Sequence, residues 1–304
     1  MIALLLSIVC STYLVICFKY FEKFRIQNLQ AIVFNYVTCV ITGIILTGNL
    51  PSASVFHRPW FTVAVFLGCC FFCIFNVMAY VARNIGVTMT SVAGKLSMVI
   101  PVSVAILLYD QPLTLVKVIA IILAIVAVIL SSERSTDDSV HLKGFEIHSS
   151  TYSFTHKKSF GVLLALVIFI SSGVNDSLVN YASEKLMQED ETNTFNIVIF
   201  SFAALCGIFV LVVRFISKRE TLQVKAMIGG IALGIPNYFS LLFLIEALNY
   251  PAWQSSVIFP VNNMGIVILT AAAAFTLFRE RLSKLNWIGM AIALFSIVLL
   301  IFSS

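Results

Sequence analysis

Two ionisable side chains lie in the middle of long apolar segments. Lys95 lies near the centre of the segment 87–109, and Asp176 lies within the segment 160–182. A charge at the centre of a bilayer costs about 2.5–3.5 kcal/mol on insertion scales, and such residues usually face a cavity or a partner. We therefore expect Lys95 to contact an anionic group of a solute, such as a carboxylate or phosphate, and Asp176 to bind a solute or a proton.

Both residues also have a structural interpretation. A salt bridge between Lys95 and Asp176 would fix the packing of two helices, and Lys95 would alternatively pack against backbone carbonyls freed at Pro101. Each charge belongs to a polar set at helical spacing, which places the set on one helix face. The two sets are Thr88, Ser91 and Lys95, and Ser172, Asp176 and Asn180.

Neutral polar side chains recur on the other apolar segments. Such residues either line a central cavity or hydrogen-bond neighbouring helices together, and the two interpretations remain open for each of them. With Lys95 and Asp176, the candidates for binding a solute are Asn35, Asn76, Tyr80, Asn180, Asn237, Gln254, Asn262 and Asn263.

Candidates for gating or ion coupling are Asp176 and four further residues. Arg83 and Glu246 occupy comparable places near the ends of the third and eighth segments, although their side chains would also snorkel to lipid headgroups. Pro101 and Pro260 interrupt helical hydrogen bonding and mark bending points, although fixed kinks fit equally well.

Motifs of soluble enzymes and metalloproteins are absent from the sequence. It contains no Gly-x-Ser-x-Gly elbow, no His-Glu-x-x-His pair and no phosphate-binding glycine loop. The four histidines lie between the apolar segments without the close spacing of metal ligands. We therefore expect no catalytic residue, no metal and no cofactor, and no built-in ATPase.

The elements that must position these side chains are ten apolar segments. The chain has 304 residues, of which 60% are hydrophobic and 11% charged, against about 45–50% and 25% in soluble domains. A membrane-spanning helix needs roughly 20 apolar residues. The net charge of +5 is spread too thinly along the chain to form a basic surface that binds nucleic acid. The predicted spans are 2–18, 28–48, 59–82, 87–109, 113–132, 160–182, 194–215, 226–248, 252–276 and 284–302.

The ten spans divide five and five about a polar connector, 133–159. Leu113–Leu130 aligns over Leu282–Leu299, and each is the last span of its half. An odd number of spans per half turns the second half upside down, which is the inverted-repeat plan of many secondary transporters. The sequence thus predicts an all-α polytopic membrane protein with a first repeat at 1–132 and a second repeat at 160–304.

Basic residues between the spans indicate an orientation. When the joints are assigned alternately to two sides, one side collects most lysines and arginines, and the other collects Arg58 and Lys185, with Lys117 just inside the fifth span. Basic loops are normally cytoplasmic, so both termini are predicted to lie outside a cell (inner) membrane. Trp60, Trp253 and Trp287 begin spans, as interfacial anchors do.

Short runs at the ends of the spans carry a family resemblance. They are Arg279-Glu280-Arg281-Leu282-Ser283 followed by Trp287 and Gly289, the joint Glu246–Ala252, and the less regular Asp110–Thr114. With the ten-span pattern, they resemble the EamA-like branch of the drug/metabolite transporter superfamily over nearly the whole chain, with a weaker likeness to nucleotide-sugar transporters. The resemblance implies two five-helix halves and solute transport by alternating access. Members commonly keep their termini in the cytoplasm, opposite to the charge count.

The expected function is that of a secondary active transporter in the lipid bilayer. It would move a small organic solute, such as an amino acid or related metabolite, with an anionic or zwitterionic solute favoured by Lys95. The alternatives are an integral membrane enzyme acting on a lipid-linked substrate and a non-transporting scaffold. The spacing Gly230-x-x-x-Gly234 allows close helix packing, either inside the protein or in a homodimer.

Overall fold

The computed structural model describes residues 2–84, 93–108, 114–131, 154–188, 190–218, 221–251, 253–277 and 283–302. Within these ranges the regular structure is helical, without strands. The helices are α1 (Ile2–Lys23), α2 (Asn28–Thr47), η1 (Ala53–His57), α3 (Phe61–Asn84), α5 (Val99–Leu108), α6 (Leu115–Ser131), α8 (Phe154–Tyr181), η2 (Ala182–Leu186), α9 (Thr192–Lys218), α10 (Val224–Leu248), α11 (Ser255–Leu277) and α12 (Lys284–Phe302).

The helices are those of a multi-pass membrane protein. In the described part of the chain, eight are long and apolar enough to cross a membrane, and two shorter apolar helices cover Ala93–Leu108 and Leu115–Leu130. Large apolar side chains such as Ile45, Phe209 and Phe302 are exposed on the outside of the bundle. A soluble domain seldom exposes so much contiguous apolar surface, whereas lipid tails solvate it readily.

The described helices overlap the ten predicted spans, but those in the fourth and fifth spans are shorter than a membrane span, and residues 87–92 and 109 of the fourth lie outside the described residues. The sixth span differs most in its boundary. α8 begins at Phe154, inside the segment predicted as a polar connector, rather than at 160. Residues 133–153 of that connector lie outside the described residues, as do Arg279–Leu282 and Asp110–Leu113 of the motifs. The polar residues after 153 therefore extend the sixth predicted span instead of ending it.

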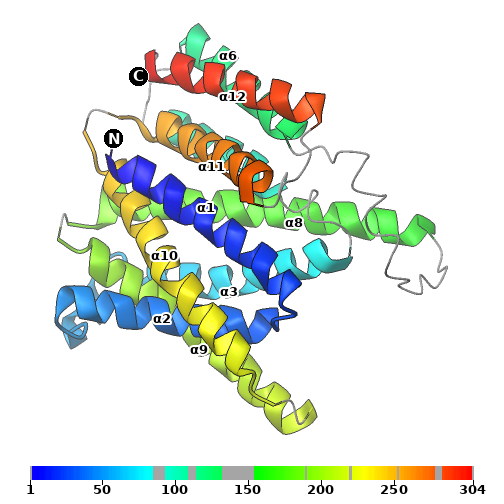
Figure 1. The fold of residues 1–304 in the computed structure, drawn as a ribbon. Helices are drawn as coiled ribbons and strands as arrows, with labels where there is room; N and C mark the ends of the chain where they lie inside the picture. Colours follow the sequence, from blue (N-terminus) through cyan, green and yellow to red (C-terminus); the bar gives the residue numbers. More distant parts are fainter. Residues whose placement is uncertain are drawn as a thin grey trace.

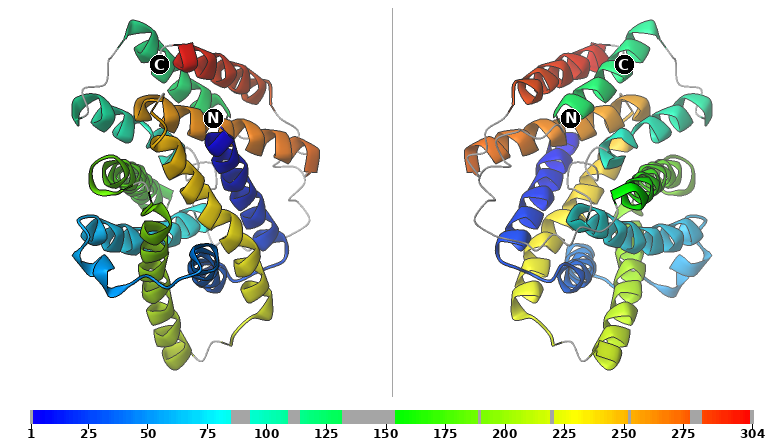
Figure 2. Two further views of the ribbon diagram at one scale, coloured as in Figure 1. Left: turned by 90° about the vertical axis from the view of Figure 1, so that its left-hand side faces the viewer. Right: turned by 90° about the vertical axis from the view of Figure 1, so that its right-hand side faces the viewer.

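The packing of the helices mixes the first and second halves of the chain. α2 packs against α9 and α10, α3 packs against α8 and α9, and α1 packs against α10 and α11 (Figure 1). α6 and α12 form a pair at one side of the bundle and meet the remainder through α11, as both views of Figure 2 also show. The two halves are thus interleaved rather than separate domains.

Two glycines of α10 set its distance from α2. A Cβ at Gly230 would lie 2.4 Å from Phe34 Cβ and 2.7 Å from the carbonyl oxygen of Ala31. A Cβ at Gly234 would lie 2.6 Å from the carbonyl oxygen of Asn35. Of the two interpretations of this glycine spacing, packing inside the protein is the one observed.

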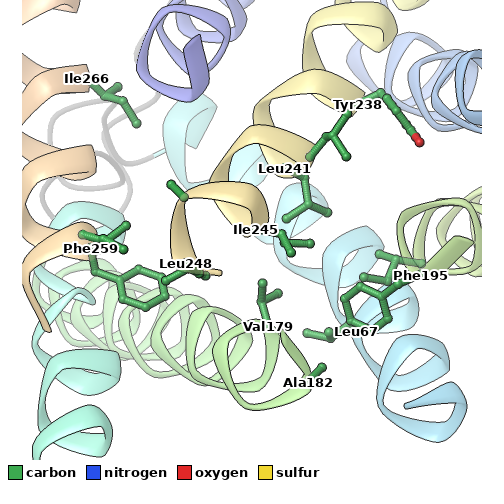
Figure 3. Packing of buried hydrophobic residues seen from close by; sticks show 14 of the residues in the cluster. Leu67, Val179, Ala182, Phe195, Tyr238, Leu241, Ile245, Leu248, Phe259 and Ile266 are labelled. Carbon is green, nitrogen blue, oxygen red and sulfur yellow. The ribbon is translucent and has the colours of Figure 1, made fainter. Parts of the chain in front are cut away.

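The core behind this contact is apolar and continuous across many helices. Tyr36 stacks on Phe200 with ring centroids 6.1 Å apart, and Phe200 in turn contacts Tyr238 at 6.1 Å. Figure 3 shows the neighbouring part of the cluster, where α3, α8, α9, α10 and α11 contribute side chains. Its labelled members are Leu67, Val179, Ala182, Phe195, Tyr238, Leu241, Ile245, Leu248, Phe259 and Ile266.

Polar contacts between the joints fall into two groups. Each contact connects residues in or beside joints that the charge pattern assigns to the same side of the membrane, as alternating helix directions require. For the side poor in basic residues, the contacts are Arg58–Glu191, Ser183–Asn249 and Lys117–Gln254. For the basic side they are Gln30–Gln223 and Leu130–Asn286.

Candidate functional site

Lys95 and Asp176 are brought together with an asparagine of a third helix. The Lys95 ammonium donates a hydrogen bond to Asn263 Oδ1 of α11 at 3.3 Å. Asp176 of α8 attracts the same ammonium electrostatically. The three side chains come from both halves of the chain and lie among apolar helices, where a charge acts more strongly than in water. We call Lys95, Asp176 and Asn263 the central cluster.

Pro101 shapes the helix that carries Lys95. A proline has no N–H to donate and its ring clashes with the carbonyl four residues earlier, here Ser97. The helix is interrupted by a turn at Ser97 and Met98, and the Ser97 carbonyl accepts instead from the Ile100 N–H at 3.0 Å. The freed carbonyl is thus satisfied by the backbone, so it does not account for the position of Lys95.

A second polar group joins α2 and α10 beside the glycine contact. Asn237 Nδ2 donates to Asn35 Oδ1 at 3.2 Å, and Cys39 Sγ donates to the Gly234 carbonyl at 3.2 Å. Asn35 is fully buried, yet its Nδ2 has no hydrogen-bond partner in the described part of the protein. The bond from Asn237 to Asn35 therefore agrees with one of the two predicted roles of these residues, hydrogen bonding between helices. Asn35 Nδ2 remains an unused donor among the described residues.

Several other buried amide atoms have no partner among the described residues. An unsatisfied buried polar atom costs about 1–3 kcal/mol and normally has a water or a ligand as its explanation. Two of these residues, Asn180 and Asn262, are predicted from the sequence to bind a solute. The third, Asn196 of α9, is not among the predicted residues. The atoms are Asn180 Oδ1, Asn262 Oδ1 and both amide atoms of Asn196.

The other predicted residues lie on α3, α10 and α11. Asn76 Nδ2 donates to the Phe72 carbonyl of its own helix at 2.7 Å, and the Tyr80 side chain is 52% exposed. Glu246 is exposed near the end of α10, and the side chain of Arg83 lies outside the described residues. Pro260 is buried inside α11, one turn before Asn263.

A buried lysine is a functional candidate that the sequence pattern indicates only as a charge at the edge of a predicted span. Lys117, in the first turn of α6, is completely buried and donates to Gln254 Oε1 and, at 3.3 Å, to Ser256 Oγ. Gln254, a predicted solute ligand, is therefore engaged by a protein cation. The signal available in the sequence was the polar run Gln254-Ser255-Ser256 at the start of a predicted span.

Trp60 is not the interfacial anchor that its position predicts. Its side chain is fully buried, and its Nε1 donates to Glu191 Oε2 at 2.9 Å. Arg58 Nε lies 3.0 Å from the other carboxylate oxygen of Glu191. The loop before α3 is thus attached to the segment that begins α9, whereas Trp287 is 55% exposed, as an anchor should be.

Replacing Trp60 with phenylalanine should lower the thermal stability of the protein in detergent. The change removes one of the two donors to the buried Glu191 Oε2, a hydrogen bond to a charged group that contributes about 1.5–3 kcal/mol. It also opens a small void beside Phe195, whose ring lies 5.6 Å from Trp60. Trp287→Phe is the matched control, because its ring is largely exposed. Equal melting temperatures for the two variants would contradict the structural role of Trp60.

Comparisons with known proteins support the fold. No protein-family model matches the sequence. An uncharacterized protein of Haemophilus influenzae is 25% identical over 306 residues, covering 97% of this chain and 95% of that protein. A protein of known crystal structure superposes with a TM-score of 0.74 over 98% of this chain and 94% of that chain, at 11% identity. The fold of this multi-pass helical protein therefore occurs in an experimentally determined structure.

Proposed function

We propose that the protein is a secondary active transporter of a small anionic or zwitterionic organic solute, of the drug/metabolite transporter type. The observation that carries the proposal is the central cluster, in which a cation, a carboxylate and an amide from three apolar helices meet. An ion pair that served packing alone would cost desolvation energy that apolar side chains avoid. Intramembrane ionisable groups mark solute and ion pathways more often than packing sites.

The neighbour relations of the helices support two inverted halves of five spans each. We pair α1 with α8, α2 with α9, α3 with α10, α5 with α11 and α6 with α12. If each helix in a contact is replaced by the helix paired with it, the α2–α10 contact becomes α9–α3, the α1–α10 contact becomes α8–α3, and the α1–α11 contact becomes α8–α5. All three resulting contacts are observed. Such symmetry is the basis of alternating access, in which the two halves exchange conformations.

The chemistry of the central cluster suits reversible binding. In the unloaded state Lys95 bonds to Asn263 and is attracted by Asp176, so the cation is never left unpaired. An incoming carboxylate or phosphate would replace these partners on Lys95, and the released Asp176 would then take a proton or the ammonium of a zwitterion. The energy for uphill movement would come from a gradient or from exchange.

Flux into liposomes tests the proposal. The purified full-length protein is reconstituted and supplied with labelled amino acids, carboxylates and phosphorylated metabolites. We expect saturable counterflow of at least one of them, and none in protein-free liposomes. Phe209→Leu, on the exposed outside of the bundle, should behave as the wild type. Absence of flux for every solute would overturn the proposal, and chemical conversion of a solute would favour the enzyme alternative.

A further inference from the structure

A pocket of about 330 Å³ opens at the end of the molecule that is poor in basic residues. One wall comes from the end of α2 and the loop before α3, and the other comes from the segment before α9 and its first turns. Its charged lining residues are Arg58, Asp190 and Glu191, with Trp60 beside them. A volume of this size suits a small molecule, and the two walls belong to different halves of the chain.

The neutral polar groups of the pocket are largely used by the protein itself. Thr47 Oγ1 donates to carbonyl oxygens of its own helix end, including Gly43 at 3.0 Å, and lies 2.9 Å from the Asn49 carbonyl. The hydroxyls of Ser52 and Ser54 bond to each other at 2.5 Å. A ligand recognised mainly through hydroxyls, such as a sugar, would therefore find few free partners, which leaves the charged groups as the recognition elements.

Glu191 is also fully engaged. Its carboxylate accepts from Trp60 Nε1 at 2.9 Å and from the Gln188 backbone N–H at 3.0 Å, and it pairs with Arg58 at 3.0 Å. Only 7% of the residue is exposed. Glu191 therefore holds Arg58 in place rather than meeting a ligand.

Arg58 and Asp190 are the charges turned to the pocket. The Arg58 side chain is 43% exposed and meets Glu191 through Nε, one of the five N–H donors of a guanidinium, whose remaining fork matches a carboxylate. Asp190 is exposed and lines the same pocket from the second half of the chain. One wall thus offers a cation and the other a carboxylate.

We infer that this pocket binds a small zwitterion, such as a free amino acid, with its carboxylate on Arg58 and its ammonium on Asp190. A metal ion would meet the repulsion of Arg58, and a simple anion or cation would use only one wall. The role of the site, capture of the solute before it reaches the central cluster, rests on the proposed transport function. The binding itself does not.

Binding should also loosen a contact between the halves. The carboxylate of the zwitterion shares the Arg58 guanidinium with Glu191 and so weakens the Arg58–Glu191 ion pair, and Glu191 is bonded to the Trp60 indole. A bound zwitterion therefore changes the surroundings of Trp60. With Trp253 and Trp287 replaced by phenylalanine, Trp60 is the only one of the three tryptophans that remains.

The test measures binding of tritiated L-alanine and L-phenylalanine to the full-length protein in detergent by scintillation proximity, with Trp60 fluorescence as a second measurement. We expect saturable binding of at least one amino acid with a matching fluorescence change. Ethylamine and propionate, which each lack one charged group of alanine, should compete at least tenfold less well than alanine. The corresponding single-charge analogues of phenylalanine are phenethylamine and 3-phenylpropionate.

Variants assign the binding to this pocket. Arg58→Gln and Asp190→Asn should each weaken binding at least tenfold, while Ser54→Ala on the same wall, whose hydroxyl is already bonded to Ser52, should leave it unchanged. Absence of binding for both amino acids, equal competition by a single-charge analogue, or binding insensitive to both charge variants would overturn the inference. Binding without liposome flux would contradict only the transport proposal, and flux without binding here would contradict only this inference.

Discussion

Lys95→Ala is expected to abolish solute uptake while the protein still folds. Truncating one member of a buried, hydrogen-bonded charge pair costs about 2–5 kcal/mol of binding, which corresponds to roughly 30- to 4,000-fold in solute affinity. Lys95 is the cation of the central cluster, and its direct partner is the Asn263 amide. Uptake in liposomes and the melting temperature in detergent, measured on the same preparations, separate lost function from lost folding.

The exchange Lys95→Asp with Asp176→Lys is the sharper variant of this experiment. Because Lys95 and Asp176 attract each other, the double variant should regain much of the stability lost in either single variant. It should not regain uptake, because the cation would then project from α8 and would no longer donate to Asn263. Full recovery of uptake would show that the pair is structural and would contradict direct binding of the solute by Lys95.

Gly234→Ala is expected to be among the most destabilising glycine-to-alanine substitutions in the protein. The new Cβ would lie 2.5 Å from Thr38 Cβ and 2.6 Å from the Asn35 carbonyl oxygen, a backbone atom that cannot move without moving α2. Overpacking of this kind costs about 1–3 kcal/mol, more than the ~1 kcal/mol that alanine gains over glycine in a helix. Separation of the helices would also lengthen the Asn237–Asn35 hydrogen bond.

Gly94→Ala is the matched control for this variant. Its Cβ would meet Met78 Cε at 3.6 Å, an ordinary contact, so the melting temperature should stay the same or rise slightly. Gly230→Ala should resemble Gly234→Ala, since it meets the Ala31 carbonyl oxygen at 2.7 Å. If all three variants had the same melting temperature, the close approach of α2 and α10 would not be important for stability.

The helices were predictable from sequence because a membrane span is a local property. In the bilayer, an apolar segment of sufficient length must pair its backbone N–H and C=O groups with each other, and it therefore forms a helix. The early start of α8 at Phe154 was not predicted because polar residues continue a helix beyond its apolar part as easily as they end it. The turn before Pro101 was equally local, since proline acts on the carbonyl four residues earlier.

The partners of the polar side chains were predictable only in part. The attraction between Lys95 and Asp176 was foreseen from the cost of buried charge, but Asn263 as the direct partner was not. Lys117 and Trp60 were misjudged for a common reason. Each stands at the edge of a span, where sequence indicates contact with water or headgroups, and each is buried by a helix or loop more than a hundred residues away.

The contacts at the end poor in basic residues bear on how tightly the membrane is sealed. Arg58–Glu191, Lys117–Gln254 and Ser183–Asn249 tie different pairs of segments, so the loss of one leaves the others closed. A carrier that lives in an energised membrane must not leak protons or ions while its helices rearrange. In a transporter of the proposed kind, spreading the closure over independent contacts would let a single one yield to an arriving solute without opening a continuous water path, and so would protect the electrical insulation of the bilayer.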